Sequence, residues 1–188
     1  MKSLMVGLGV LALVATAGIP LIIGQTAAQS SRPYAGMQAR AIKALSAEQI
    51  ADLKAGRGLS LALAAELNGY PGPRHVLELV EQLGLTDQQR ADVQRLFDDM
   101  TAEVVPLGEM LIAQEAELER LFAGRVVTPS SLRAATAAIG ATQAELRNAH
   151  LKYHLLTSGL LTAAQMQRYS QLRGYLDGDS GIQHRPNH

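Results

Sequence analysis

The sequence predicts an all-α fold, an elongated and kinked helical hairpin with short flanking helices. Val, Ile and Thr are sparse after the N-terminal segment and never alternate over the length of a strand, whereas Ala, Leu, Glu, Gln and Arg dominate. Helix-capping residues recur along the chain, and two long stretches repeat apolar residues alternately three and four positions apart. We therefore expect no β-sheet.

The same helix-start signal occurs three times, in residues 45–49, 85–89 and 161–165. In each copy a hydroxyl side chain can accept a hydrogen bond from the backbone N–H three positions later, and the Gln there can bond back to the first residue's own N–H. This reciprocal arrangement is a capping box, so a helix is expected to begin at each copy. Four of these side chains are interpreted as purely structural caps, each contributing on the order of 1 kcal/mol: Thr86, Gln89, Thr162 and Gln165.

Short helices are expected between the first two start signals. The Gly- and Pro-rich residues 68–73 separate a short helix around residues 59–67 from another around residues 74–83. A long helix then begins at Thr86 and ends at Gly124, because Gly commonly terminates helices. Thr128 and Pro129 mark the start of the next helix, because Pro is favoured at the first helical position.

The two long helices carry matching apolar seams. The first seam consists of Val93, Phe97, Met100, Val104, Leu107, Leu111, Gln114, Leu118 and Leu121. The second consists of Leu132, Ala135, Ile139, Thr142, Leu146, Ala149, Tyr153, Leu156 and Leu160. Because a short turn joins them, the seams predict an antiparallel hairpin. The first helix would be about 55 Å long at 1.5 Å per residue, and Pro106 should bend it.

The N-terminal segment predicts export. Residues 4–24 carry no charge and are numerous enough to cross a hydrocarbon core. Residues 1–28 are interpreted as a secretory signal with cleavage after Ala28, and the alternative is an uncleaved anchor in the inner membrane through residues 4–24. We expect a flexible leader at 29–44, a helical domain at 45–176 and a disordered tail at 177–188, which holds His184 and His188.

Composition and motifs exclude several classes of function. The 17 basic and 17 acidic residues balance, which argues against a dedicated nucleic-acid binder because such a protein needs a basic face. The chain has no Cys, so disulfides, thiolate metal sites and a Cys nucleophile are excluded. A chain without Cys also suits an oxidising compartment, because it has no unpaired thiol that could be oxidised. It also has no Gly-rich phosphate loop after a strand, no HExxH motif and no nucleophile elbow. We therefore expect a protein that is not an enzyme.

The pair of LTxxQ motifs at residues 85–89 and 161–165, with a long hairpin between them and an export signal in front, resembles the Spy/CpxP family of periplasmic stress proteins. The resemblance covers residues 46–175, and the wider group includes metal-binding proteins of the ZraP/CnrX type. It implies a periplasmic, ATP-independent chaperone without a required cofactor. It also implies a homodimeric helical cradle that holds unfolded client proteins or modulates an envelope sensor protein.

A leucine-rich face is the candidate client or dimer surface. The second long helix is apolar beyond its seam around Leu151, Leu155, Leu156 and Leu160, and surplus apolar surface on an exported chain usually marks an interface. The alternative is packing against the helices before Gly84. Because the mature charge is near neutral and the first long helix is acidic, we expect apolar contact to hold clients rather than long-range attraction.

Four residues form the candidate metal site of an alternative function. His150 and His154 are four apart on one side of a helix, and His75 and Glu78 are three apart on an earlier one. The heptad count places the first pair beside the seam and partly accessible. The metal-binding relatives imply a divalent ion such as zinc, copper, nickel or cobalt. A third interpretation is a structural protein that docks onto another envelope protein.

Overall fold

The computed structural model describes residues 34–175. Contacts divide the chain into two units, Met1–Ala35 and Gly36–His188. The predicted signal or anchor at 1–28, the first part of the leader and the predicted tail with His184 and His188 lie outside the described residues. No helix within residues 34–175 has the length and hydrophobicity required to span a membrane.

The described part of the chain is helical and contains no strand, so the all-α prediction is confirmed. A short 3-10 helix, η1 (Met37–Ala39), precedes seven α-helices. They are α1 (Ala47–Lys54), α2 (Leu63–Glu66), α3 (Pro73–Leu77), α4 (Val80–Leu83), α5 (Asp87–Ala123), α6 (Pro129–Leu160) and α7 (Ala163–Leu172).

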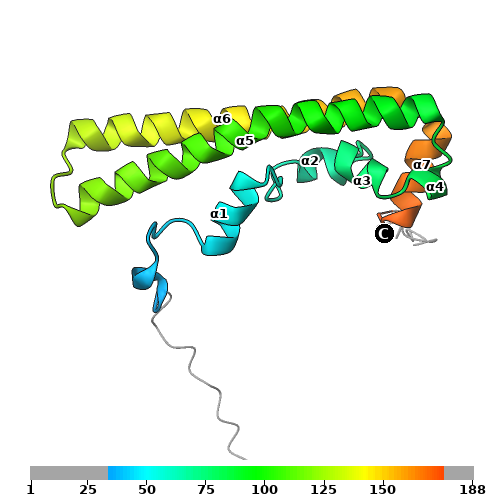
Figure 1. The fold of residues 1–188 in the computed structure, drawn as a ribbon. Helices are drawn as coiled ribbons and strands as arrows, with labels where there is room; N and C mark the ends of the chain where they lie inside the picture. Colours follow the sequence, from blue (N-terminus) through cyan, green and yellow to red (C-terminus); the bar gives the residue numbers. More distant parts are fainter. Residues whose placement is uncertain (1–33, 176–188) are drawn as a thin grey trace, which may run out of the picture. The chain divides into compact units, whose positions relative to one another are not determined.

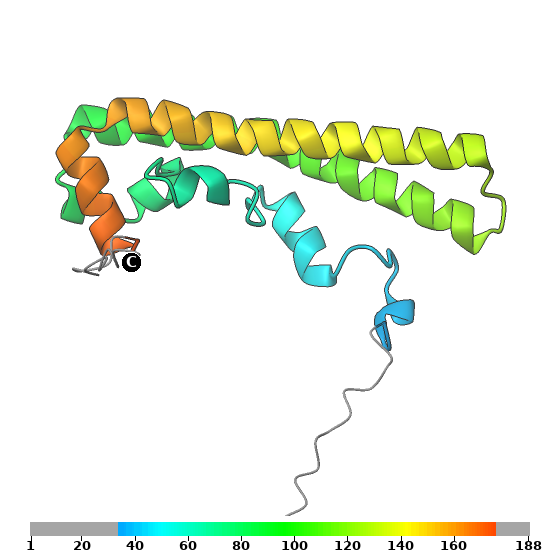
Figure 2. The ribbon, with the colours of Figure 1, turned by 180° about the vertical axis from the view of Figure 1, so that it is seen from behind.

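Helices α5 and α6 run side by side and antiparallel, as the two seams predict (Figure 1). Met100, Val104 and Leu111 of α5 meet Ile139, Leu146, Ala149 and Tyr153 of α6 in one buried cluster. Helix α5 continues through Pro106, and the second half of its ribbon runs at an angle to the first in both views (Figures 1 and 2).

The second seam differs from the heptad count near its end. Leu156 is 47% exposed, whereas Thr157 is fully buried. A straight helix has 3.6 residues per turn, so the face that meets the partner drifts relative to a strict seven-residue repeat. By the last turns of α6 the buried row has moved by one position, which turns Leu156 outward.

The short helices are more broken than the sequence predicts. The helix expected around residues 59–67 is reduced to α2, because Leu59 and Ser60 have positive φ angles of 43° and 66° that a right-handed helix cannot contain. The helix expected around residues 74–83 is divided into α3 and α4 at Leu79. Packing of this segment against the hairpin overrides its local helix propensity.

Helices α1 to α3 lie along one side of the hairpin, and α4 contacts α7 at its end (Figures 1 and 2). Helix α1 approaches α5 closely at Gly108, where an added Cβ would lie 2.5 Å from the carbonyl oxygen of Leu53. Ile42 is buried, and Lys43 Nζ lies 2.8 Å from Glu119 Oε1. The predicted flexible leader is therefore packed against the hairpin at its described end.

All three predicted capping boxes are present, and two of them are also joined to each other. Gln89 Nε2 donates to Gln165 Oε1 at 2.9 Å, and Gln165 Nε2 donates to Gln89 Oε1 at 3.0 Å. Gln89 Nε2 also donates to the Leu160 carbonyl at 2.9 Å. The two LTxxQ motifs thus cap their own helices and connect the start of α5 to the start of α7, a pairing that the sequence does not predict.

A double-mutant cycle tests this pairing. Gln89→Ala and Gln165→Ala should each lower the free energy of unfolding, and their combined effect should deviate from additivity by about 0.5–2 kcal/mol because they share two hydrogen bonds. Gln49→Ala is the matched control, since Gln49 holds the same capping-box position in α1. Paired with Gln165→Ala it should be additive in urea unfolding. Additivity in both cycles would contradict the pairing.

Replacement of Gly by Ala is expected to have opposite effects on stability at two helical positions. Gly108→Ala should destabilise the protein by about 1–3 kcal/mol, because its Cβ would force the backbone of α1 away from α5. Gly140→Ala should stabilise it by up to about 1 kcal/mol, because nothing lies within 4 Å of that Cβ and Ala favours the helix. Thermal unfolding followed by circular dichroism measures both, and a stabilised Gly108→Ala variant would show that α1 does not approach this closely.

Candidate functional site

A cavity of about 310 Å³ lies between residues 55–75, α5, α6 and the end of α7. Its apolar lining includes Leu59, Leu63, Phe97 and Met100. Its polar lining consists of Ser60, Glu66, His75, His150, His154, Tyr175 and three arginines, Arg57, Arg74 and Arg173. The fold therefore brings three of the four predicted metal ligands to one cavity, whereas Glu78 is not among its lining residues.

The two histidines of α6 are buried, contrary to the predicted partial accessibility. His150 is 4% exposed and His154 is 8% exposed. A Cβ at Gly72 would lie 2.7 Å from His154 Nε2, and a Cβ at Gly58 would lie 3.5 Å from His150 Nδ1. These glycines allow the backbone of residues 55–75 to lie directly on the imidazoles. The heptad count considers only the two helices of the hairpin, so it does not predict that this segment covers the histidines.

A buried carboxylate organises one end of the cavity. Glu66 is 6% exposed and its Oε1 accepts hydrogen bonds from the hydroxyls of Tyr169 and, at 3.0 Å, Tyr175. Glu66 Oε2 accepts from the Gly72 N–H at 3.4 Å, and Arg173 Nε lies 3.8 Å from Oε1. Burial and the bond to Glu66 raise the pKa of the Tyr169 hydroxyl far above its ordinary range, so Tyr169 remains a donor.

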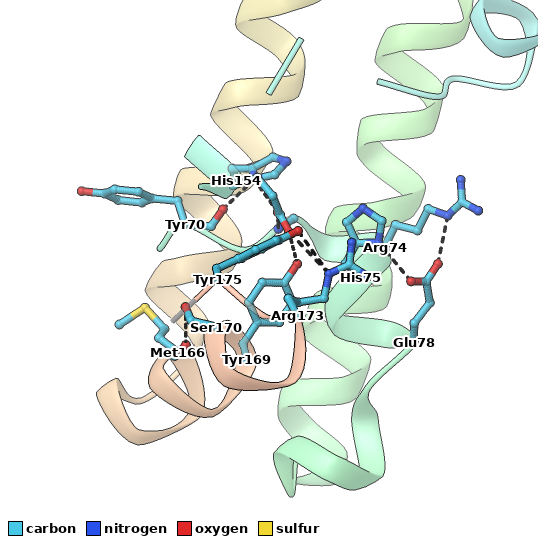
Figure 3. A network of polar contacts seen from close by, with 12 residues as sticks. Tyr70, Arg74, His75, Glu78, His154, Met166, Tyr169, Ser170, Arg173 and Tyr175 are labelled. Atoms are coloured by element: carbon cyan, nitrogen blue, oxygen red, sulfur yellow. Dashed lines mark hydrogen bonds and ion pairs between the residues drawn. The ribbon is translucent and has the colours of Figure 1, made fainter. Parts of the chain in front are cut away.

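His154 links this network to α6. Its Nδ1 lies 2.7 Å from the Tyr70 carbonyl oxygen and 3.7 Å from Glu66 Oε2. A carbonyl can only accept, so Nδ1 carries the proton of that bond. Figure 3 shows His154, Tyr175 and Arg173 gathered close together, with His75 and Arg74 beside them.

His150 is the least satisfied polar group of the cavity. Its Nε2 is buried and has no hydrogen-bond partner in the described part of the chain. Burial, with a smaller contribution from nearby His154, lowers the pKa of His150 from 6.5 to about 4. The imidazole is therefore uncharged at neutral pH.

His75 and Glu78 pair with each other at the rim. His75 Nδ1 lies 3.0 Å from Glu78 Oε2, and Arg74 Nε donates to Glu78 Oε1 at 3.2 Å. The bond to His75 is the main reason that the pKa of Glu78 is lowered. Within residues 34–175 no three His, Asp or Glu side chains converge as a set that could hold a metal ion.

The leucine-rich face divides into exposed and packed members. Leu155 is 58% exposed and Leu156 is 47% exposed. Leu151 is partly buried, and Leu160 packs against the buried cluster that includes Tyr169. A shallow groove of about 380 Å³ borders Leu155 and is also lined by Asn68, Gly69, Tyr70, Ser158, Gly159 and Met166.

Sequence reasoning missed Glu66, Tyr70, Tyr169, Arg173 and Tyr175. Glu66 follows an apolar run, which gives a weak signal of burial, but its two tyrosine donors come from more than 100 positions away. No local spacing connects them.

Comparison with known proteins finds no matching family model, no matching curated protein and no matching solved structure.

The state of His150 has a measurable consequence for stability. The folded state holds the ring neutral down to about pH 4, whereas the unfolded chain protonates it near pH 6.5, so the free energy of unfolding should fall as the pH decreases between these values. The contribution is at most roughly 3 kcal/mol, at about 1.4 kcal/mol per pH unit. In urea unfolding measured at several pH values across this range, the free energy of unfolding of His150→Gln should depend less steeply on pH than that of the unmodified protein. A His150 ring that titrates near 6.5 by NMR would contradict its burial.

Proposed function

We propose that this chain is an exported, ATP-independent chaperone of the Spy/CpxP type that shields apolar segments of unfolded clients in the periplasm. The observation that carries the proposal is the exposed leucine face of α6 beside an uncharged groove. Leu155 and Leu156 are about half exposed, and Tyr70 across the groove is 42% exposed. The paired LTxxQ motifs and the helical hairpin support the same proposal through their resemblance to that family.

The groove suits weak and reversible binding. Each residue that lines it is apolar, aromatic or uncharged, so an unfolded segment would be held by burial of apolar area rather than by ion pairs. Burial of apolar surface contributes about 25 cal/mol per Å² and is not directional, which allows many client sequences to bind. Nothing in this mechanism requires ATP, because release follows from the low affinity of a shallow contact.

Suppression of aggregation tests the proposal. A few-fold excess of the purified protein should reduce light scattering by chemically reduced insulin, and Leu155→Ser with Leu156→Ser should remove most of this effect. Phe122→Ser is the matched control, since Phe122 is 53% exposed at the far end of α5. Absence of suppression by the unmodified protein would refute the chaperone proposal. Equal losses in the control would place the client surface elsewhere.

The same variants address the homodimer. If Leu155 and Leu156 form a subunit interface, sedimentation should show dimers for the unmodified protein and monomers for the doubly substituted one. Unchanged sedimentation together with lost suppression would assign the leucine face to clients alone. A protein that captures an envelope partner but suppresses no aggregation would favour the structural docking role.

Divalent metal binding is the second candidate function. It is favoured because His75, His150 and His154 line one cavity. The Nδ1 atoms of His75 and His154 are engaged with Glu78 and Tyr70, so both histidines would bind the ion through Nε2. Calorimetric titration with zinc, copper, nickel and cobalt decides between the functions. Affinity weaker than micromolar, or affinity that is unchanged in His150→Gln with His154→Gln, would exclude this candidate.

A further inference from the structure

We propose that the cavity between residues 55–75 and α6 binds a small organic anion, a carboxylate on a short apolar body. The geometry that points to it is the position of three arginines around a cavity with an apolar floor. This site is separate from the leucine face and does not depend on the chaperone proposal.

The arginines have unused hydrogen-bonding capacity. Arg57, Arg74 and Arg173 each bond through Nε, to Asp52, Glu78 and the Tyr175 hydroxyl respectively. No described residue accepts a hydrogen bond from their terminal Nη nitrogens. A guanidinium presents these nitrogens as a planar fork that matches the two oxygens of a carboxylate.

The charge of the lining favours an anion. Glu66 is the only carboxylate among the described residues that line the cavity, against three guanidinium groups. Its oxygens accept hydrogen bonds from two tyrosine hydroxyls and the Gly72 N–H, and its Oε1 lies 3.8 Å from Arg173 Nε, so Arg57 and Arg74 are the guanidinium groups that would meet an anion. The ion pairs of Arg57 and Arg74 are on side chains that are 45% and 54% exposed, and such pairs are weak enough for an anion to share the guanidinium.

The apolar lining and the volume of the cavity indicate a ligand with a short apolar body. Leu59, Leu63, Phe97 and Met100 line the cavity, and a volume of about 310 Å³ is at the small end of the range for ligand pockets. The short body lies against these side chains, while the carboxylate faces the arginines at the rim.

His150 provides a further hydrogen-bonding group in the lining of the cavity. Its Nε2 has no partner, which is unusual for a buried polar atom. A half-turn of the ring exchanges Nε2 with Cε1, and Cε1 lies 3.6 Å from the position of a Cβ on Gly58, another residue that lines the cavity. The free nitrogen can therefore reach the cavity and donate to a bound carboxylate.

Octanoate is the test ligand, with octanol and octylamine as neutral and cationic controls of the same chain length. Octanoate should bind the full chain in calorimetry and shift the His150 ring resonances in NMR, and both controls should bind at least about tenfold more weakly. Arg57→Gln with Arg74→Gln should weaken octanoate binding by about tenfold. Arg95→Gln is the matched control, because Arg95 is an exposed arginine paired with Asp92 outside the cavity, and it should bind octanoate normally.

Gly58→Leu is a second, independent variant. Its Cβ would be in ordinary contact with the His150 ring, so the larger side chain should fill the cavity and abolish the NMR shift. The arginine variants provide the decisive result if Gly58→Leu does not fold. Equal binding of octanoate and octanol, or octanoate binding that leaves His150 unshifted, would overturn the proposal. Octanoate affinity that Arg57→Gln with Arg74→Gln leaves unchanged would also overturn it.

Discussion

The buried carboxylate of Glu66 is the interaction on which the rest of the structure depends. A charge at 6% exposure is tolerated only when donors surround it, and here they come from Gly72, Tyr169 and Tyr175. Satisfying one carboxylate therefore requires α2, the loop before α3 and the end of α7 to meet. That meeting covers the histidines of α6 and encloses the cavity.

Close backbone contact makes this meeting feasible. A side chain at Gly58 or Gly72 would touch a histidine of α6, and a side chain at Gly108 of α5 would touch Leu53 of α1, so the short helices can lie nearly in contact with α5 and α6. The bonded Gln89 and Gln165 fix the starts of α5 and α7 at the same end. Helix ends and glycines, rather than a large core, position this site.

The hairpin and its caps were predictable because they depend on local rules. A capping box needs four consecutive residues, and a seam needs only a regular repeat of apolar residues. The pair Thr86 and Gln89, the seam of α5 from Val93 and the seam of α6 up to Tyr153 could therefore be predicted directly from the sequence. The covering of His150 and His154 could not, because it depends on where a segment some 80 residues earlier folds back. The division of residues 74–83 and the outward turn of Leu156 likewise follow from tertiary packing and helix geometry.

The covering of the hairpin is uneven along its length. Helices α1 to α3 lie over the part that contains Met100 and Ala149, whereas Phe122, Val126 and Leu132 at the turn between α5 and α6 are 37% exposed or more. Opening of the structure should therefore be graded: the turn can fray at little free-energy cost while the end held by Glu66 remains closed. Hydrogen exchange would then begin at the turn and proceed toward α7, so the chain has a built-in order in which its parts come apart.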